Sequence, residues 1–237
     1  MSADSPQPVA KSILSVSDIT HASRVIDWLH TYISRPHPQI GRSGAVCPFV
    51  PISLKANTLC FVVHGEINGL DPHAIADLLR SYLRWFAATA PESSTECRRR
   101  GLVIVLPHLA KDSLQQLDEI HSNVKTEMVL NGLMLGQFYE SCPETAVRNP
   151  NFRVSTGPVP CFAIRHMAPH DVLFLHSRSD WFAEYHRRFS VDYRNNKIKD
   201  PMMLRLFQSA ESKWGTRKRR SEHSGEWSSA DHCSREV

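Results

Sequence analysis

The residues best suited to chemistry begin with a cysteine in a loop of glycine and proline residues. The loop spans Gly41–Pro51, with the sequence GRSGAVCPFVP, and presents Cys47 directly before Pro48. Glycine permits backbone conformations that other side chains exclude, and proline fixes the backbone where the loop ends. A thiolate held in this way can act as a nucleophile or as a ligand of a metal or haem iron. A small apolar side chain at the edge of the core is the structural alternative.

A second candidate segment follows an apolar run late in the chain, where Arg165, His166 and Met167 are consecutive. His170 and Asp171 come within about one further turn. A neutral imidazole oriented by a carboxylate is a common iron ligand, and the same pairing supports general base catalysis. We therefore predict His166 as a metal ligand and His170 with Asp171 as catalytic residues. A hydrogen-bonded histidine of the core or its edge remains the alternative.

The third candidate segment is the turn Asn149–Arg153, with the sequence NPNFR. Asn-Pro dipeptides and the nearby Thr156-Gly157-Pro158 run favour a shaped loop, and such loops concentrate binding residues. Arg153 and Arg165 are thus candidate cations for the carboxylates of a cofactor. A tight connection between two strands is an equally good interpretation of the turn.

The elements that must position these residues follow from hydrophobic periodicity and from residues that break regular structure. Apolar runs bounded by breakers predict strands at residues 58–64, 101–107, 133–139 and 159–167. Helices are predicted from Ser17 or Asp18 to Ile33, from Asp71-Pro72, from Asp112 to Asn131-Gly132, around 180–189, and after Asp200-Pro201. In the first helix, one buried stripe is expected to contain Ile19, Ala22, Ile26, Leu29 and Ile33.

Two successive strands after a strand–helix alternation favour an α+β fold, with helices packed on a mixed or antiparallel sheet. We expect residues 17–212 to form a single domain. Residues 1–16 are expected to be a disordered lead, and residues 213–237 a disordered tail rich in Ser, Arg, Glu and His.

Composition limits the classes of partner. The chain has 237 residues and a net charge of +4, and much of its clustered positive charge lies at Arg217–Arg220. That distribution argues against nucleic acid, which calls for a concentrated basic face, and leaves open a targeting role for the cluster. No apolar run approaches the ~20 residues that a membrane span needs. Six scattered cysteines without a CxxC pair, and no signal-like start, predict reduced thiols and a cytoplasmic location.

Four segments together resemble a family of uncharacterised proteins encoded in microbial secondary-metabolite clusters. They are GAVCPFVP at 44–51, GLMLGQF at 132–138, NPNFR at 149–153 and AIRHM at 163–167. More remotely, the Cys-Pro-Phe loop and the order of elements are similar to the YqcI/YcgG proteins, some of which are haem-dependent enzymes that oxidise the side-chain nitrogen of amino acids. That resemblance implies a haem with His166 as axial ligand, Arg165 and Arg153 near its propionates, and Cys47 lining the pocket.

Three functions follow as hypotheses. The first is a biosynthetic enzyme that uses haem for oxygenation or N-oxidation of a small amino-acid-like metabolite. The second is a cofactor-free enzyme with Cys47 as nucleophile and His166 or His170 as base, performing acyl transfer, cyclisation or isomerisation. The third is a non-catalytic binding or accessory protein. All three leave the identity of the ligand and the oligomeric state open.

Overall fold

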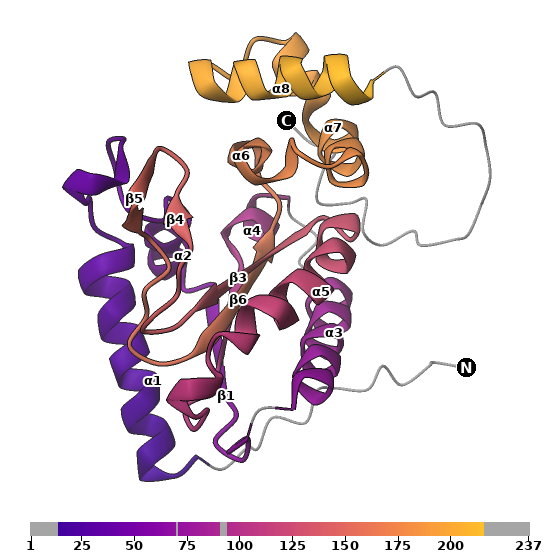
Figure 1. Cartoon of the computed structure of the whole chain (residues 1–237). Coiled ribbons are helices and arrows are strands. Elements are labelled where there is room, and N and C mark those ends of the chain that lie inside the picture. The colour runs from indigo at the N-terminus through magenta and orange to yellow at the C-terminus, as the bar shows by residue number, and fades with distance from the viewer. Residues whose placement is uncertain (1–13, 70, 91–93, 216–237) are drawn as a thin grey trace.

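A mixed β-sheet forms the centre of the fold, and helices cover both of its faces (Figure 1). The computed structural model describes residues 14–69, 71–90 and 94–215. The sheet has the strand order β1-β2-β6-β3. β1 and β2 are parallel, whereas β6 is antiparallel to both of its neighbours. The predicted α+β class is confirmed.

The strands are β1 Leu59–Val63, β2 Gly101–Val105, β3 Leu133–Phe138, β4 Thr145–Ala146, β5 Asn149–Arg153 and β6 Cys161–His166, of which β4 and β5 form a separate hairpin. The helices are α1 Val16–Trp28, α2 Val50–Ala56, α3 Pro72–Ala88, α4 Ser94–Arg99, α5 Gln116–Leu130, α6 Val172–Leu175, α7 Ser179–Arg194 and α8 Pro201–Trp214. A π-helical segment, Leu29–Ile33, continues α1, and short 3₁₀ turns precede α2, α5 and α6.

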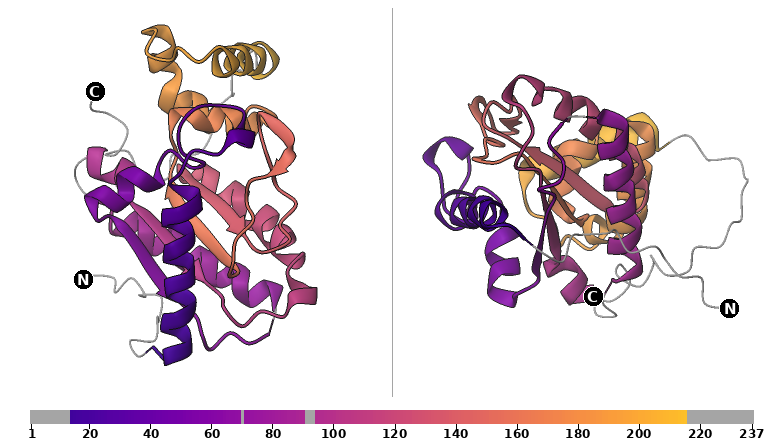
Figure 2. Two further views of the ribbon diagram at one scale, coloured as in Figure 1. Left: turned by 90° about the vertical axis from the view of Figure 1, so that its left-hand side faces the viewer. Right: turned by 90° about the horizontal axis from the view of Figure 1, so that it is seen from below.

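The two faces of the sheet pack against different helices, because successive strand residues point to opposite sides. Leu102 and Ile164 face α3 and α5 and belong to the larger core cluster. Val103 and Cys161 face α1 and the loop that follows it. Figure 2, seen from below, shows the sheet between α1 and α3. Consequently Arg165 and His166, consecutive in sequence, lie on opposite faces of the sheet.

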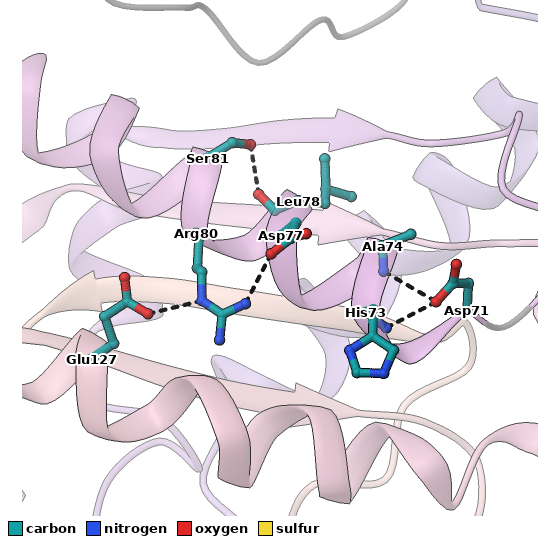
Figure 3. A network of polar contacts seen from close by, with 8 residues as sticks. All are labelled: Asp71, His73, Ala74, Asp77, Leu78, Arg80, Ser81 and Glu127. Carbon is teal, nitrogen blue, oxygen red and sulfur yellow. Dashed lines mark hydrogen bonds and ion pairs between the residues drawn. The ribbon is translucent and has the colours of Figure 1, made fainter.

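Polar contacts along α3 fix that helix to α5 (Figure 3). Asp71 caps α3 by accepting hydrogen bonds from the backbone N–H groups of His73 and Ala74. Farther along, the Arg80 guanidinium donates to the Glu127 carboxylate of α5 at 2.9 Å. The network lies outside the sheet, so it supports the layer behind the sheet rather than any site on the α1 side.

The last three helices pack beyond the end of the sheet, as seen at the top of Figure 1. Their core is aromatic: the ring of Tyr193 stacks on that of Phe207, with centroids 3.8 Å apart. Met134 of β3 and Met167, just after β6, join the same cluster. The turn that carries His170 and Asp171 therefore lies where the sheet meets this helical unit.

Local differences from the predictions have simple causes. Helix α1 begins at Val16, because Ser15 caps it in a reciprocal pair with Asp18. Ile19 and Ile26 are 55% and 38% exposed, and Val25 takes the buried place instead. The predicted cap Asp112 lies in a 3₁₀ turn before α5.

The helices α2, α4 and α6 were not predicted, nor was the β4–β5 hairpin, which replaces the turn expected at 149–153. The expected lead and tail fall mainly on residues 1–13 and 216–237, which lie outside the described residues together with the Arg217–Arg220 cluster.

Candidate functional site

A cavity of about 310 Å³ lies on the α1 side of the sheet, below the loop that carries Cys47. Apolar side chains supply most of its wall, among them Trp28, Ile33 and Phe49. Ala163 lies in its floor and is only partly buried although it belongs to a central strand. Its cross-strand neighbour Gly136 has no side chain, and the Phe138 ring lies beside it, 3.3 Å from where a Cβ would stand. The size and the apolar lining are typical of a small-molecule site.

Backbone contacts hold the Cys47 loop against the π-helical end of α1. The N–H of Cys47 donates to the carbonyl of Ile33, and the N–H of Val46 donates to that of Arg35. At the start of the loop Gly41 has a φ of 77°. A Cβ at Gly41 would lie 2.8 Å from the Cβ of Arg148, so both the backbone conformation and the close approach require glycine. The loop is thus a fixed wall of the cavity, as its composition predicted.

One end of the cavity holds a buried ion pair between Arg165 and Asp171. The guanidinium donates to both carboxylate oxygens, at 2.8 and 2.6 Å, and the backbone N–H of Ala168 donates to the carboxylate at 2.7 Å. Asp171 has no exposed surface, whereas the Arg165 side chain is 23% exposed. Burial opposes the charge of Arg165, but the charge and hydrogen bonds of Asp171, followed by the Cys47 sulfur, raise its pKa above the usual value. Asp171 therefore orients Arg165, and not a histidine as predicted.

Phe49 joins this ion pair to the loop. The guanidinium carbon of Arg165 lies 4.0 Å from the centroid of the Phe49 ring, a cation–π geometry. The exposed His170 ring lies at the edge of the same phenyl ring, with centroids 5.8 Å apart. Partial desolvation of the ring still lowers the pKa of His170, and the charge of Asp171 partly opposes that shift. Cys47, Arg165, His170 and Asp171 all border the cavity, so the structure brings these four predicted residues together.

Cys47 and the two candidate bases do not form a nucleophile–base pair in the described part of the chain. No hydrogen bond joins the Cys47 sulfur to His170, whose ring is packed against Phe49. His166 is on the far face of the sheet, where its ring lies 5.1 Å from that of Phe86.

His166 and Arg153 lie apart from the cavity. Burial, and then the charges of Arg100, Arg188 and Arg165, lower the pKa of His166 to about 4, so its ring is neutral near pH 7. Its Nε2 is buried and has no hydrogen-bond partner among the described residues. Arg153 is exposed on β5, and neither it nor His166 lines the cavity.

A haem bound as the resemblance implies does not fit this arrangement. An axial ligand must face the cavity that holds the porphyrin, yet the His166 ring lies beside Phe86 on the other face of the sheet, and the charges of nearby arginines act on it. Arg165, expected near a propionate, is already paired in two-point fashion with Asp171. No group of three or more His, Cys, Asp or Glu side chains suited to a metal ion occurs among the described residues.

Sequence reasoning missed the basic residues that surround the cavity, chiefly Arg148 and Lys125. Arg148 pairs with Asp200, while its buried Nε has no partner among the described atoms. Lys125 on α5 is half-buried, and burial lowers its pKa although the charges of Glu144 and Asp171 oppose the shift. The available signal was that His121 and Lys125 lie four residues apart, on one side of a predicted helix.

Residues 22–200 match the family described as "Domain of unknown function (DUF6875)". The chain belongs to the DUF6875 family. The matched range includes the Cys47 loop, the Arg165–Asp171 pair and Lys125, so the cavity lies within the DUF6875 part of the chain. No curated protein and no solved structure matches this DUF6875 chain. Among its described residues, no helix has the length and apolar character that crossing a membrane requires.

Proposed function

We propose that this chain binds a small organic molecule with a flat apolar body, in the cavity between the sheet and the Cys47 loop. The observation that carries the proposal is the combination of a cavity of about 310 Å³ with a floor of small residues at Gly136 and Ala163. A core of this kind is normally closed by larger side chains, since interiors are close-packed. The resemblance of four segments to proteins of secondary-metabolite clusters supports a biosynthetic metabolite as the ligand.

Chemistry at Cys47 is a second candidate, because its sulfur borders the cavity and contributes to the raised pKa of Arg165. In an acyl transfer, the thiolate would attack the carbonyl carbon of a bound ester or thioester. A C–S bond forms, the bond to the leaving group breaks, and the leaving group departs with the electron pair and takes up a proton. Arg165 would stabilise the thiolate before attack, and water or an amine would release the acyl group.

The binding proposal is tested by filling the cavity. Ala163→Leu adds a branched side chain to the cavity floor and should abolish binding of neutral bicyclic aromatic probes such as naphthalene-2-carboxamide. Ala88→Leu makes the same change on the exposed surface of α3 and serves as the matched control. Binding is measured by titration calorimetry on the full chain. Equal affinity of wild type and Ala163→Leu, or no binding of any probe in the bicyclic set to wild type, would contradict the proposal.

The thiol candidate has its own test in the same protein. Cys60 is exposed on β1, outside the cavity, and Cys47 lines it. A bound cavity probe should therefore slow alkylation of Cys47 by iodoacetamide and leave the rate at Cys60 unchanged. Mass spectrometry of peptides resolves the two sites. Equal alkylation rates at Cys47 with and without the probe would show that the thiol is not part of the ligand site.

A further inference from the structure

A second cavity adjoins the first and is lined by more polar residues. It has a volume of about 400 Å³ and lies between α5, the edge strand β3 and the start of α7. Four side chains border both cavities, namely His121, Lys125, Gln137 and Glu144. The apolar space is therefore continued by a polar one at the edge of the sheet. A ligand with an apolar body and a polar head would occupy both.

Most polar groups of the second cavity already have partners. Gln137 and Tyr139 each donate to one oxygen of the Asp118 carboxylate, at 3.1 and 2.8 Å. The ring Nε2 of His121 lies 2.9 Å from the carbonyl oxygen of Leu135. Arg178 binds Asp180 through two hydrogen bonds. These groups are committed to the fold and offer little to a ligand.

Lys125 differs from these groups. No hydrogen bond or ion pair joins its ammonium to another residue in the described ranges, and its nitrogen lies 5.0 Å from the centroid of the Trp181 ring. Burial lowers the pKa of Lys125, since desolvation disfavours the ammonium form, and the charges of Glu144 and Asp171 oppose that shift without a hydrogen bond to the ammonium. A half-buried ammonium without a hydrogen-bonded partner is a binding group for an anion at the boundary of the two cavities.

We infer that the cavity ligand carries a carboxylate head that binds Lys125, while its apolar body lies over Ala163. This inference rests on the proposed function and adds the chemical class of the ligand. Glu144 borders the same space, and the Asp118 carboxylate lies in the wall. Their negative charges favour a monoanion over a phosphate dianion. The ligand class is thus an aromatic or branched apolar carboxylic acid.

The test compares three probes with one aromatic body, naphthalene-2-carboxylate, naphthalene-2-carboxamide and 2-naphthyl phosphate, by titration calorimetry on the full chain. A hydrogen bond to a charged group contributes ~1.5–3 kcal/mol, so the carboxylate should bind wild type about 10-fold or more tightly than the amide. The phosphate should bind no better than the amide. A phosphate preference, or equal affinities of acid and amide, would overturn the assignment.

Variants then locate the preference. Lys125→Gln should bring the acid to the affinity of the amide, and Lys125→Arg should retain the preference, because it keeps the positive charge. Lys55→Gln removes an exposed lysine on α2 and is the matched control. An acid preference that persists in Lys125→Gln would contradict the role of Lys125.

The two proposals fail in different ways. If the amide binds in a manner sensitive to Ala163→Leu but the acid gains nothing, the cavity proposal stands and the carboxylate inference is wrong. If Ala163→Leu lowers the affinity of none of the three probes, the proposal that the cavity binds a ligand is wrong. The comparison of acid and amide uses only the wild-type protein. The inference can therefore be refuted even if the Lys125 variants do not fold.

Discussion

Asp171→Asn is the sharpest perturbation of the site, because it removes one charge from a buried ion pair and changes no volume. Asp171 accepts two hydrogen bonds from Arg165 and one from the N–H of Ala168, and it has no exposed surface. An asparagine in its place offers one acceptor oxygen and turns its NH₂ toward another donor. The Arg165 guanidinium then loses its counter-charge while it remains mostly buried.

The magnitude follows from burial. Breaking a buried ion pair by removing one partner costs ~3–5 kcal/mol, most of it from the charge left behind. The Arg165 side chain is 23% exposed, so water partly solvates it. We therefore expect Asp171→Asn to lower the free energy of unfolding by about 3 kcal/mol, at the lower end of that range. The contact between Arg165 and Phe49 should loosen as well, which would speed alkylation of Cys47.

The chain contains a matched control of the same chemistry. Arg178 and Asp180 form a two-point pair at 3.1 and 2.7 Å, but their side chains are 50% and 33% exposed. Exposed pairs contribute only ~0–1 kcal/mol, so Asp180→Asn should have a small effect. Urea unfolding of wild type and both variants at pH 7 gives the comparison. Equal losses in Asp171→Asn and Asp180→Asn would refute the argument from burial.

Three further predictions concern titration, thiol reactivity and capping. Burial lowers the pKa of His121 from 6.5 to about 4, so the unfolded chain binds the proton more readily than the folded chain. The free energy of unfolding should therefore be unaffected by His121 above pH 6.5 and fall by roughly 3 kcal/mol as the pH drops to 4. Urea unfolding at several pH values should show a weaker pH dependence in His121→Gln. Burial raises the pKa of Cys161 to about 12, so iodoacetamide should label Cys47 and leave Cys161 unmodified in the native protein, and native labelling of Cys161 would contradict its burial. Ser15→Ala removes the α1 cap and should cost about 1 kcal/mol in thermal or urea unfolding, against a few tenths for the exposed Thr20→Ala.

Periodicity and breakers predicted the sheet strands and the long helices, because each has a strong local cause. The buried run Gly101–Val105 shows one such cause, and the Asp71-Pro72 cap shows another. The short elements escaped prediction because their stability is tertiary. Helix α2 has only seven residues, and the β4–β5 hairpin is held partly by Asn149 donating to Gln39.

Only part of the candidate site could be predicted from the sequence, for a related reason. The glycine and proline residues indicated that the Cys47 loop was rigid, and a rigid loop is a local property. Whether Arg165 and His166 share a site depends on which residue of β6 faces which helix. Alternation assigns them to opposite faces, but the choice of face is set by pairing with β2 and β3. The spacing of His121 and Lys125 places them on one side of α5, but their position at the cavity depends on how α5 packs beside the edge strand β3.

The proposed binding function would explain why the fold keeps a cavity that lowers its stability. Residual cavity volume in a core costs ~24 cal/mol per Å³, so an enclosed apolar space of about 310 Å³ would correspond to an upper bound of roughly 7 kcal/mol. That is comparable with the whole stability of a typical domain, ~5–15 kcal/mol, and because the cavity opens to water the actual cost is smaller. One branched side chain at Ala163 would recover some of this energy. Ala163→Leu should therefore stabilise the free protein while it blocks the probe. Filling a packing defect would raise stability as well, so the accompanying loss of probe binding is what identifies a ligand cavity.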